Sequence, residues 1–396
     1  MRSITLSKSG LNKIRNNQFE LKTIDFEDSI KSIPPGEWLL AKAGPEEFWF
    51  GFINPMIEDK YTCSYFLGKL SSKSIAAFSV EEFISECISS AYKKRCQVSG
   101  YEDSSRVFYG ISDGLPGLII DQFKNAVIVQ INTAGVDRYR EMIKSFVEKL
   151  LERPVYLLDN AKYREKESLP TFDNAALPDL DVVENGLKYK IRKEVLQKVG
   201  FYYDHRENRY HLMNLISRLN KKPETAVDLF SYAGAWGISA LKAGVKNVQF
   251  VDQGEFSDEV DNALKLNGFS GAGSFVRADV FKFLDSIINE SKKIDLVLCD
   301  PPAFAKSALH KPQALEGYSK LHRKVLKVVS TGGVVAFSSC THYVSHEEFQ
   351  KNILAAANKE NRKIQLVYCG IQGLDHPVSS LEDRSNYIKS YFYIVE

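Results

Sequence analysis

From Thr225 onward the chain alternates short apolar runs with helical stretches, and this alternation limits its fold more than any other feature. The runs TAVDLF, VQFVD, IDLVLCD and GGVVAFSSC are each nearly continuous in apolar residues. Strands buried on both faces have this pattern, and stretches such as WGISALKAG and EFSDEVDNALKLNG supply the helices between them. The sequence therefore predicts an α/β fold with a doubly wound, mostly parallel sheet.

The earlier part of the chain follows a different pattern. The runs WLLAKA and FWFGFINP predict a small β-rich module at the N-terminus. A helix capped by Ser79 is expected next, followed by a β-meander in RVFYGISDGLPGLIIDQFKNAVIVQINTAG. An amphipathic helix is expected over residues 136–151, and further strands at 154–159, 181–184 and 187–192. We interpret this middle part as a separate α+β domain.

Composition indicates an ordinary globular protein, with 44% hydrophobic and 26% charged residues. No apolar run is long enough to span a membrane, and the N-terminus lacks the apolar core of a secretory signal, so we expect a cytoplasmic protein. The six cysteines form no CxxC pair. His342 and His346 are four residues apart, but Ser345 and Glu348 form a capping box that leaves His342 before the helix. We therefore expect no metal.

A net charge of +2 does not by itself indicate nucleic-acid binding, but basic residues crowd one tract before the alternating region. Runs of this kind are usually solvated faces. Beside a ligand-binding sheet, the tract nonetheless favours a partner with a phosphate backbone. Its members are Lys188, Lys190, Arg192, Lys193, Lys198, Arg206, Arg209, Arg218, Lys221 and Lys222.

Glycine and acidic residues stand where the predicted strands end, which is where a doubly wound sheet binds its ligands. The first strand runs into a loop whose GxxG spacing, at Gly234 and Gly237, disfavours the pyrophosphate of a dinucleotide. The candidate cofactor residues of this loop are Asp228, Phe230, Ser231, Tyr232 and Gly234.

Two later strands end at acids. Asp252 suits the hydroxyls of a ribose, and Asp279 could accept from an adenine amino group, although either could instead be a helix N-cap. Together with a glycine loop that lacks phosphate spacing, these acids indicate S-adenosylmethionine (SAM) as the cofactor rather than NAD.

The next two strands end at Asp300-Pro301-Pro302 and at Cys340. The first motif resembles the acceptor site of methyltransferases that act on nucleobases, in which the acid meets a ring nitrogen or an exocyclic amine and Phe304 can stack on the base. A cysteine facing such a motif suits methylation at carbon 5 of a pyrimidine, because a thiolate must first add to carbon 6. The alternative is that Cys340 is a small buried strand residue.

At these residues the chain resembles the ribosomal RNA large-subunit methyltransferase I family, which makes 5-methylcytosine in 23S rRNA. The motifs are SDGLPGLIIDQF, QKVGFYYDHRENR, DLFSYAGAWG, DPPAFAKS, GYSKLH, FSSCTH and DHPV. The resemblance implies a PUA-like RNA-binding domain over residues 1–76, a central α+β domain over 77–193 and a Rossmann-like SAM-dependent domain over 194–396. It implies ribosomal RNA as the partner and is compatible with a homodimer.

The resemblance also implies roles for single residues. Cys340 would be the nucleophile and Asp300 the acid that faces the base, with Asp300 also lining the cofactor. The segment Gly200–Arg206 would cover the cofactor through Phe201 and Asp204, and Arg206 suits the methionine carboxylate. The acceptor side would be lined by Pro301, Pro302, Phe304 and Lys306.

The chain departs from the family on what we take to be the acceptor side. Ala303 stands in place of a lysine, His205 in place of a glutamine, and His322 in place of an asparagine. Two other hypotheses therefore stay open. The chain could methylate an exocyclic amine, with Cys340 only structural, or it could be an RNA-binding assembly factor with a degenerate cofactor fold. The acids at Asp252, Asp279 and Asp300 argue against the latter.

Overall fold

The computed structural model describes residues 1–16, 18–44, 46–58, 61–159, 161–171, 176–196, 200–305, 307–381, 383 and 385–396. The chain forms two compact units, Met1–Pro178 and Asp179–Glu396, which are described separately. Within the described ranges, no helix has both the length and the apolar character needed to cross a membrane.

The first unit begins with a five-stranded sheet in the order β1-β3-β4-β5-β2. The two N-terminal runs predicted as strands form its antiparallel pair β3–β4. Whether this module is PUA-like stays a prediction. The strands are β1 (Arg2–Thr5), β2 (Glu20–Leu21), β3 (Glu37–Lys42), β4 (Glu47–Ile53) and β5 (Ser64–Ser71), and helix α1 covers Lys8–Arg15.

The second sheet of this unit has the order β6-β7-β8-β9, in which the predicted meander β6–β8 is antiparallel and β9 is parallel to β8. Ser79 caps α2 as predicted. The helix expected over residues 136–151 is instead two helices, because the backbone leaves the helical range at Tyr139 (φ −109°, ψ 18°). The elements are α2 (Val80–Arg95), β6 (Ser105–Tyr109), β7 (Leu118–Gln122), β8 (Val127–Ile131), α3 (Ala134–Asp137), α4 (Arg140–Leu151), β9 (Val155–Leu157) and α5 (Ala161–Lys166).

One hydrophobic core joins both sheets of the first unit. Trp38 and Phe52 from the N-terminal sheet lie in the same buried cluster as Ile84 of α2 and Val129 of β8. The division of the chain into three domains therefore stays a prediction.

The second unit is built on a seven-stranded sheet in the order β14-β13-β12-β15-β16-β18-β17. The first five of these strands are parallel, and β18 is antiparallel to both of its neighbours. This confirms the predicted doubly wound, mostly parallel sheet. The strands are β12 (Thr225–Leu229), β13 (Asn247–Asp252), β14 (Gly273–Arg277), β15 (Ile294–Cys299), β16 (Val329–Ser339), β17 (Ile364–Gly370) and β18 (Lys389–Val395).

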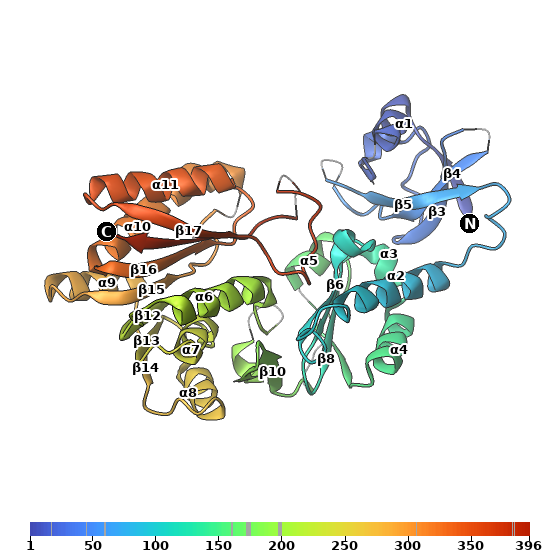
Figure 1. The fold of residues 1–396 in the computed structure, drawn as a ribbon. Coiled ribbons are helices and arrows are strands. Elements are labelled where there is room, and N and C mark those ends of the chain that lie inside the picture. Colours follow the sequence, from blue (N-terminus) through green and yellow to red (C-terminus); the bar gives the residue numbers. More distant parts are fainter. Residues whose placement is uncertain are drawn as a thin grey trace. The chain divides into compact units, whose positions relative to one another are not determined.

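Helices cover both faces of this sheet (Figure 1). One face carries α6 (Arg206–Arg218), α7 (Ala235–Lys242) and α8 (Ser257–Leu266), and the other carries α9 (Val280–Asn289), α10 (Lys311–Val328) and α11 (His346–Lys359). A hairpin of β10 (Leu180–Glu184) and β11 (Leu187–Ile191) packs against α8. Short 3₁₀ helices cover Thr23–Asp25, Gly110–Asp113, Lys193–Val195, Tyr203–His205 and Ala308–His310.

Candidate active site

The expected cofactor loop, residues 228–237, leaves β12 with an unusual backbone. Phe230 and Tyr232 have positive φ angles of 62° and 46°, although neither is glycine. Such residues cost about 1–3 kcal/mol each and persist where the surrounding structure holds them, often at ligand sites. Gly234 (φ 77°) has no room for a side chain, because a Cβ there would lie 2.9 Å from the ring of Phe250. This glycine serves both the turn and the packing beneath it.

Two buried polar atoms of this loop lack a hydrogen-bond partner among the described residues. Asp228 Oδ2 accepts from the backbone N–H of Gly237 at 2.8 Å, whereas Asp228 Oδ1 and Ser231 Oγ are unpaired. Burial raises the pKa of Asp228 well above its usual range, and the charges of Asp300 and Asp252 raise it further. An acid and a hydroxyl held in this way suit a polar, donor-bearing ligand such as the amino-acid end of SAM.

The two acids at later strand ends have different local roles. Asp252 accepts from the backbone N–H of Tyr232 at 3.1 Å and of Gly254 at 2.9 Å, so it braces the cofactor loop and caps no helix. Asp279 is exposed and is the N-cap of α9, where it accepts from Lys282 N at 3.0 Å. The helix-cap alternative therefore applies to Asp279 and not to Asp252.

The described part of the covering segment, Gly200–Arg206, is tied to the cofactor loop and to the C-terminal part of the chain. Tyr232 Oη donates to the carbonyl of Gly200 at 2.7 Å. Tyr387 Oη donates to Asp204 Oδ2 at 2.7 Å. Tyr202 lies where these parts meet: burial raises its pKa, as do the negative charges of Asp204, Cys340, Asp300 and Asp252.

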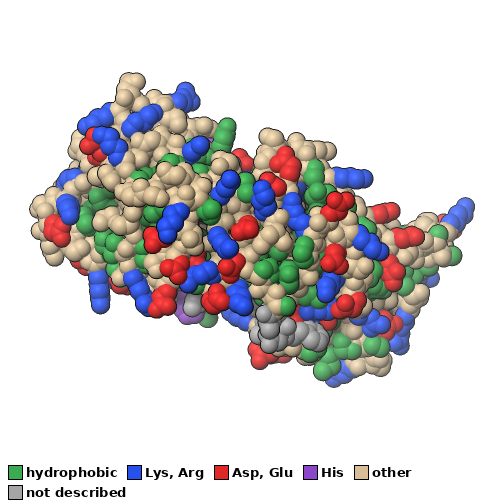
Figure 2. All heavy atoms as spheres, turned by 90° about the horizontal axis from the view of Figure 1, so that it is seen from below, with side chains coloured by type: hydrophobic (Ala, Val, Ile, Leu, Met, Phe, Trp, Pro, Cys, Tyr) green, Lys and Arg blue, Asp and Glu red, His purple; other side chains and the backbone are tan. Residues whose placement is uncertain are grey.

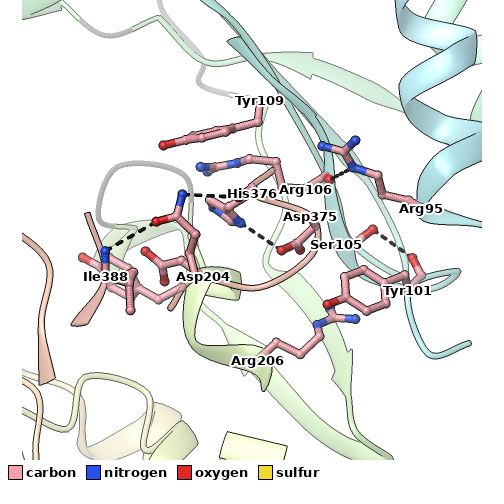
Figure 3. Close-up of polar contacts among 12 residues, drawn as sticks. Arg95, Tyr101, Ser105, Arg106, Tyr109, Asp204, Arg206, Asp375, His376 and Ile388 are labelled. Carbon is pink, nitrogen blue, oxygen red and sulfur yellow. Dashed lines mark hydrogen bonds and ion pairs between the residues drawn. The ribbon is translucent and has the colours of Figure 1, made fainter. Parts of the chain in front are cut away.

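Phe201 and Arg206 pack toward the β10–β11 hairpin. Phe201 lies between the rings of Tyr189 and Tyr203, at centroid distances of 5.2 and 5.3 Å. Arg206 is 1% exposed and has its Nε 3.6 Å from Glu184, and Figure 3 shows its side chain directed away from Asp204. The contacts predicted for these two residues with the cofactor stay predictions.

Two arginines of the basic tract form ion pairs within the protein. Arg209 is buried and bonds Glu184 at 2.6 and 2.8 Å, and Arg192 bonds Glu259 at 2.6 and 3.0 Å. On the face shown in Figure 2, basic and acidic side chains are interspersed. Arg192 and Arg209 therefore serve the fold through ion pairs, while Lys198 of the tract lies outside the described residues.

Asp300 follows β15 directly, and two side chains from other elements hold its carboxylate. Trp236 Nε1 donates to Asp300 Oδ2 at 3.0 Å, and His205 Nε2 lies 3.4 Å from the same oxygen. Burial lowers the pKa of the His205 imidazole, but the charge of Asp300, its hydrogen bond to the ring and the charge of Asp204 together outweigh burial and raise the pKa. His205, which departs from the family pattern, thus contacts the predicted base-facing acid.

Cys340 follows β16, the strand next to β15, and the two strand-end loops contact each other. Cys340 Sγ lies 3.9 Å from the carbonyl oxygen of Pro301, and Thr341 Oγ1 donates to the carbonyl of Ala305 at 3.2 Å. Because Cys299 pairs with Phe337, both loops leave the same edge of the sheet. The structure thus brings together the predicted nucleophile and the motif that carries the predicted acid.

Stacked aromatic rings position Phe304. Its ring lies 4.6 Å from that of Tyr318 at an interplanar angle of 29°, and Tyr318 Oη bonds Ser339 Oγ at 2.9 Å. His322 is 1% exposed and packs behind Tyr318, against Phe337. The expectation that His322 touches the acceptor side is therefore wrong, because its ring belongs to the core.

The other predicted acceptor residues differ in exposure. Pro301 is buried, Pro302 is exposed and Ala303 is half-buried, while Lys306 lies outside the described residues. Among the residues that the structure places, no three His, Cys, Asp or Glu side chains gather as a metal site would require.

Sequence reasoning missed Lys389, Trp236 and Tyr202. Lys389 is 2% exposed at the start of β18. One signal could have found it, since it is the only charge in the apolar run YIKSYFYIV. A lysine in such a run is seldom buried without a role.

Comparisons with known proteins identify the relatives of this chain. A family described as S-adenosylmethionine-dependent methyltransferase matches residues 143–351. Ribosomal RNA large subunit methyltransferase I of Klebsiella pneumoniae (strain 342) is 31% identical over 297 residues, which cover 73% of each chain. The protein of that name in Aeromonas salmonicida (strain A449) is 32% identical over 304 residues, covering 75% of this chain and 74% of its own.

Solved structures share the fold over the whole chain. SMU.776, described as a methyltransferase complexed with SAH, superimposes with a TM-score of 0.77 at 18% identity, and both chains are fully covered. A protein described as a SAM-dependent methyltransferase from Streptococcus mutans gives a TM-score of 0.75 at 18% identity, again with full coverage of both chains.

Proposed function

Because this chain belongs to the ribosomal RNA large subunit methyltransferase I family of SAM-dependent methyltransferases, we propose that it methylates carbon 5 of a cytosine in 23S rRNA. One observation carries the proposal. The loops of Asp300 and Cys340 leave adjacent parallel strands and contact each other through Cys340 Sγ and the carbonyl of Pro301, at 3.9 Å.

The proposed chemistry uses Cys340 and Asp300 on one pyrimidine ring. Carbon 5 of cytosine is a poor nucleophile until the Cys340 thiolate adds to carbon 6. Asp300 would share a proton with ring nitrogen 3, which neutralises the negative charge that the addition places on the ring. SAM supplies the electrophilic methyl group. Carbon 5 would take this methyl group, and its proton would then pass to solvent water. The bond between Cys340 and carbon 6 would break with its electrons returning to sulfur, which restores the free thiolate.

The proposed cofactor site uses the loop after β12. The unpaired Asp228 Oδ1 and Ser231 Oγ would receive the amino-acid end of the cofactor, and Asp252 the ribose. Asp279, exposed at the start of α9, would meet the adenine. The backbone from Phe230 to Gly234, which is held in place by Asp252 and Phe250, would pass along the ligand, and the segment Gly200–Arg206 would cover it.

The proposed acceptor site is formed by the Asp-Pro-Pro loop. Phe304 is backed by Tyr318, so its ring is held in a fixed orientation for stacking on an extruded base. Pro301 and Pro302 restrict the backbone beside Asp300. Lys306 would contact the RNA backbone.

Substitution of the nucleophile tests this proposal. We expect Cys340→Ala to bind SAH as the native protein does, because the thiol is not part of the cofactor loop, and to lose methyl transfer by at least about three orders of magnitude. Cys369→Ala, which changes an exposed cysteine of β17, is the matched control. Bisulfite sequencing of 23S rRNA from cells carrying each variant measures the outcome.

Two results would reject the assignment. Methylation of cytosine carbon 5 by Cys340→Ala would exclude the thiolate mechanism. A methylated exocyclic amine that depends on this protein would identify an N-methyltransferase in which Cys340 is structural.

A further inference from the structure

A buried lysine lies at the strand end that carries Cys340. Lys389 is 2% exposed, and its Nζ donates to the carbonyl oxygens of Thr341, at 2.6 Å, and of Tyr387, at 2.9 Å. In the described part of the chain, no carboxylate forms an ion pair with it. Burying an ammonium group in this way is costly unless a negative charge compensates for it.

Sheet register places Lys389 next to Cys340. In the antiparallel pair β16–β18, Lys389 is opposite Ser339, the residue before Cys340. Its Nζ bonds the carbonyl of Thr341, the residue after Cys340. The ammonium group is thus anchored on the backbone immediately beyond the thiol.

Side-chain hydrogen bonds also hold the segment that leads into β18. Gln372 Oε1 accepts from the backbone N–H of Tyr387 at 3.0 Å and of Ile388 at 3.4 Å, and its Nε2 donates to the carbonyl of His376 at 3.2 Å. Figure 3 shows Ile388 and His376 in this arrangement, with His376 bonded to Asp375. The backbone that leads into Lys389 is therefore held by side-chain hydrogen bonds as well as by the sheet.

Electrostatics couples the two groups. Burial lowers the pKa of Lys389 to about 8, and the negative charge of Cys340 opposes that shift. The lysine is thus still mostly protonated at neutral pH, and the interaction is reciprocal: a charge that favours the ammonium is itself favoured by it.

We propose that Lys389 is a positioning residue that stabilises the thiolate of Cys340 and holds the Cys340–Thr341 backbone against the Asp-Pro-Pro loop. The thiol proton passes to solvent, and Lys389 stays an ammonium throughout. This inference rests on the proposed function only for the role of Cys340 as the nucleophile. It assigns the activation of Cys340 to β18 rather than to His342, which is exposed.

Thiol alkylation tests this role without RNA or SAM. The rate of iodoacetamide modification of Cys340 is followed by peptide mass spectrometry from pH 6 to 10 in the native protein, Lys389→Met and Lys389→Arg. Methionine keeps the length of the side chain without its charge, so the pH of half-maximal reactivity should rise by about one unit or more. Arginine keeps the charge and should restore most of the native midpoint. Cys96, which is exposed and lies in the other unit, is the internal control.

A purely structural lysine would give a different pattern. Lys389→Met would then change the reactivity of Cys340 by the same factor at every pH, with no shift of the midpoint, and the proposal would be overturned. Circular dichroism and SAH binding establish whether the variant folds.

The native protein provides a second measurement that does not depend on any Lys389 variant. The midpoint of Cys340 should lie about one pH unit or more below that of Cys96 in the same molecule. Equal midpoints would reject the role of Lys389 even if Cys340→Ala abolished methylation. A low midpoint in a protein whose Cys340→Ala variant still methylates RNA would reject only the proposed function.

Discussion

At the scale of single residues, the site places one buried acid close to two partly exposed ones. Asp228 is buried, and Asp252 and Asp300 lie close enough for their charges to raise its pKa. An acid with a raised pKa keeps a proton that the unfolded chain has already released, so its contribution to stability is lost as the pH rises above the unfolded value. A negative charge on Asp228 therefore destabilises the folded protein unless a ligand compensates for it.

Replacing Asp228 should stabilise the fold and weaken the binding of SAH. We expect Asp228→Asn to raise the free energy of unfolding at pH 7, because the amide can still accept from Gly237 N and carries no charge that burial would penalise. We also expect it to weaken SAH binding about tenfold or more, which corresponds to about 1.4 kcal/mol. Urea unfolding and titration calorimetry measure the two effects. Asp261→Asn, on the exposed surface of α8, is the control, and a destabilised Asp228→Asn would contradict the explanation.

The site residues that were predicted from the sequence are those that directly follow a predicted strand. Asp300 and Cys340 each follow an apolar run, so their placement at one edge of the sheet follows from local pattern alone. Trp236 and Lys389 reach the same edge from α7 and from β18, over separations that no local pattern encodes. His205 was noticed as a departure from the family, but its contact with Asp300 appears only in three dimensions.

At the scale of elements, α10 connects the acceptor loop to the core. Tyr318 stacks on Phe304, and His322, one turn later, is enclosed by Phe337 and Phe349. Burial lowers the pKa of His322 to about 3, although a hydrogen bond with Asn352 opposes the shift. The ring is therefore neutral in the folded protein at any pH near neutrality.

Low pH should reduce the free energy of unfolding through the buried ring of His322. Between pH 6.5 and 3 the unfolded chain binds a proton at His322 that the folded chain does not, so the free energy of unfolding should fall as the pH falls, by up to about 1.4 kcal/mol per pH unit. His322→Asn should remove this contribution while keeping a polar partner for Asn352. Urea unfolding at pH 7, 6 and 5 measures both proteins, and parallel pH dependences in the two would contradict the prediction.

In the seven-stranded sheet, the strands that sequence reasoning missed are β17 and β18 at its C-terminal edge. The parallel strands β12, β13, β15 and β16 can be predicted because each lies in a run that is nearly continuous in apolar residues. In β17 polar and apolar residues are mixed and several are exposed, so its pattern is weaker. The ion pairs of Arg209 with Glu184 and of Arg192 with Glu259 could not be read from the basic tract, because the partners are distant in the sequence.

At the scale of the whole molecule, each compact unit has a hydrophobic core of its own. The core around Phe52 and Val129 belongs to the first unit, and the core around Val297 and Tyr318 belongs to the second. The candidate cofactor residues all belong to the second unit. A cofactor should therefore stabilise the two units unequally.

Calorimetry of the full chain tests whether the cofactor stabilises one unit more than the other. We expect two unfolding transitions, of which SAH raises only the one that belongs to residues 179–396. At a concentration about 100 times its dissociation constant, the ligand should add about 2.7 kcal/mol to that unit. Limited proteolysis at each plateau identifies the unit that has unfolded. A single transition, or an equal rise of both, would show that the units unfold together.

The position of β18 also affects when the protein becomes reactive during its synthesis. β18 follows β17 in the chain, yet it lies between β16 and β17 in the sheet and brings Lys389 beside Cys340. A growing chain that has already paired β15 with β16 carries Cys340 without that buried cation. Its sulfur stays in the less reactive thiol form until the strand inserts, so the nascent protein is protected from oxidation while its site is still open.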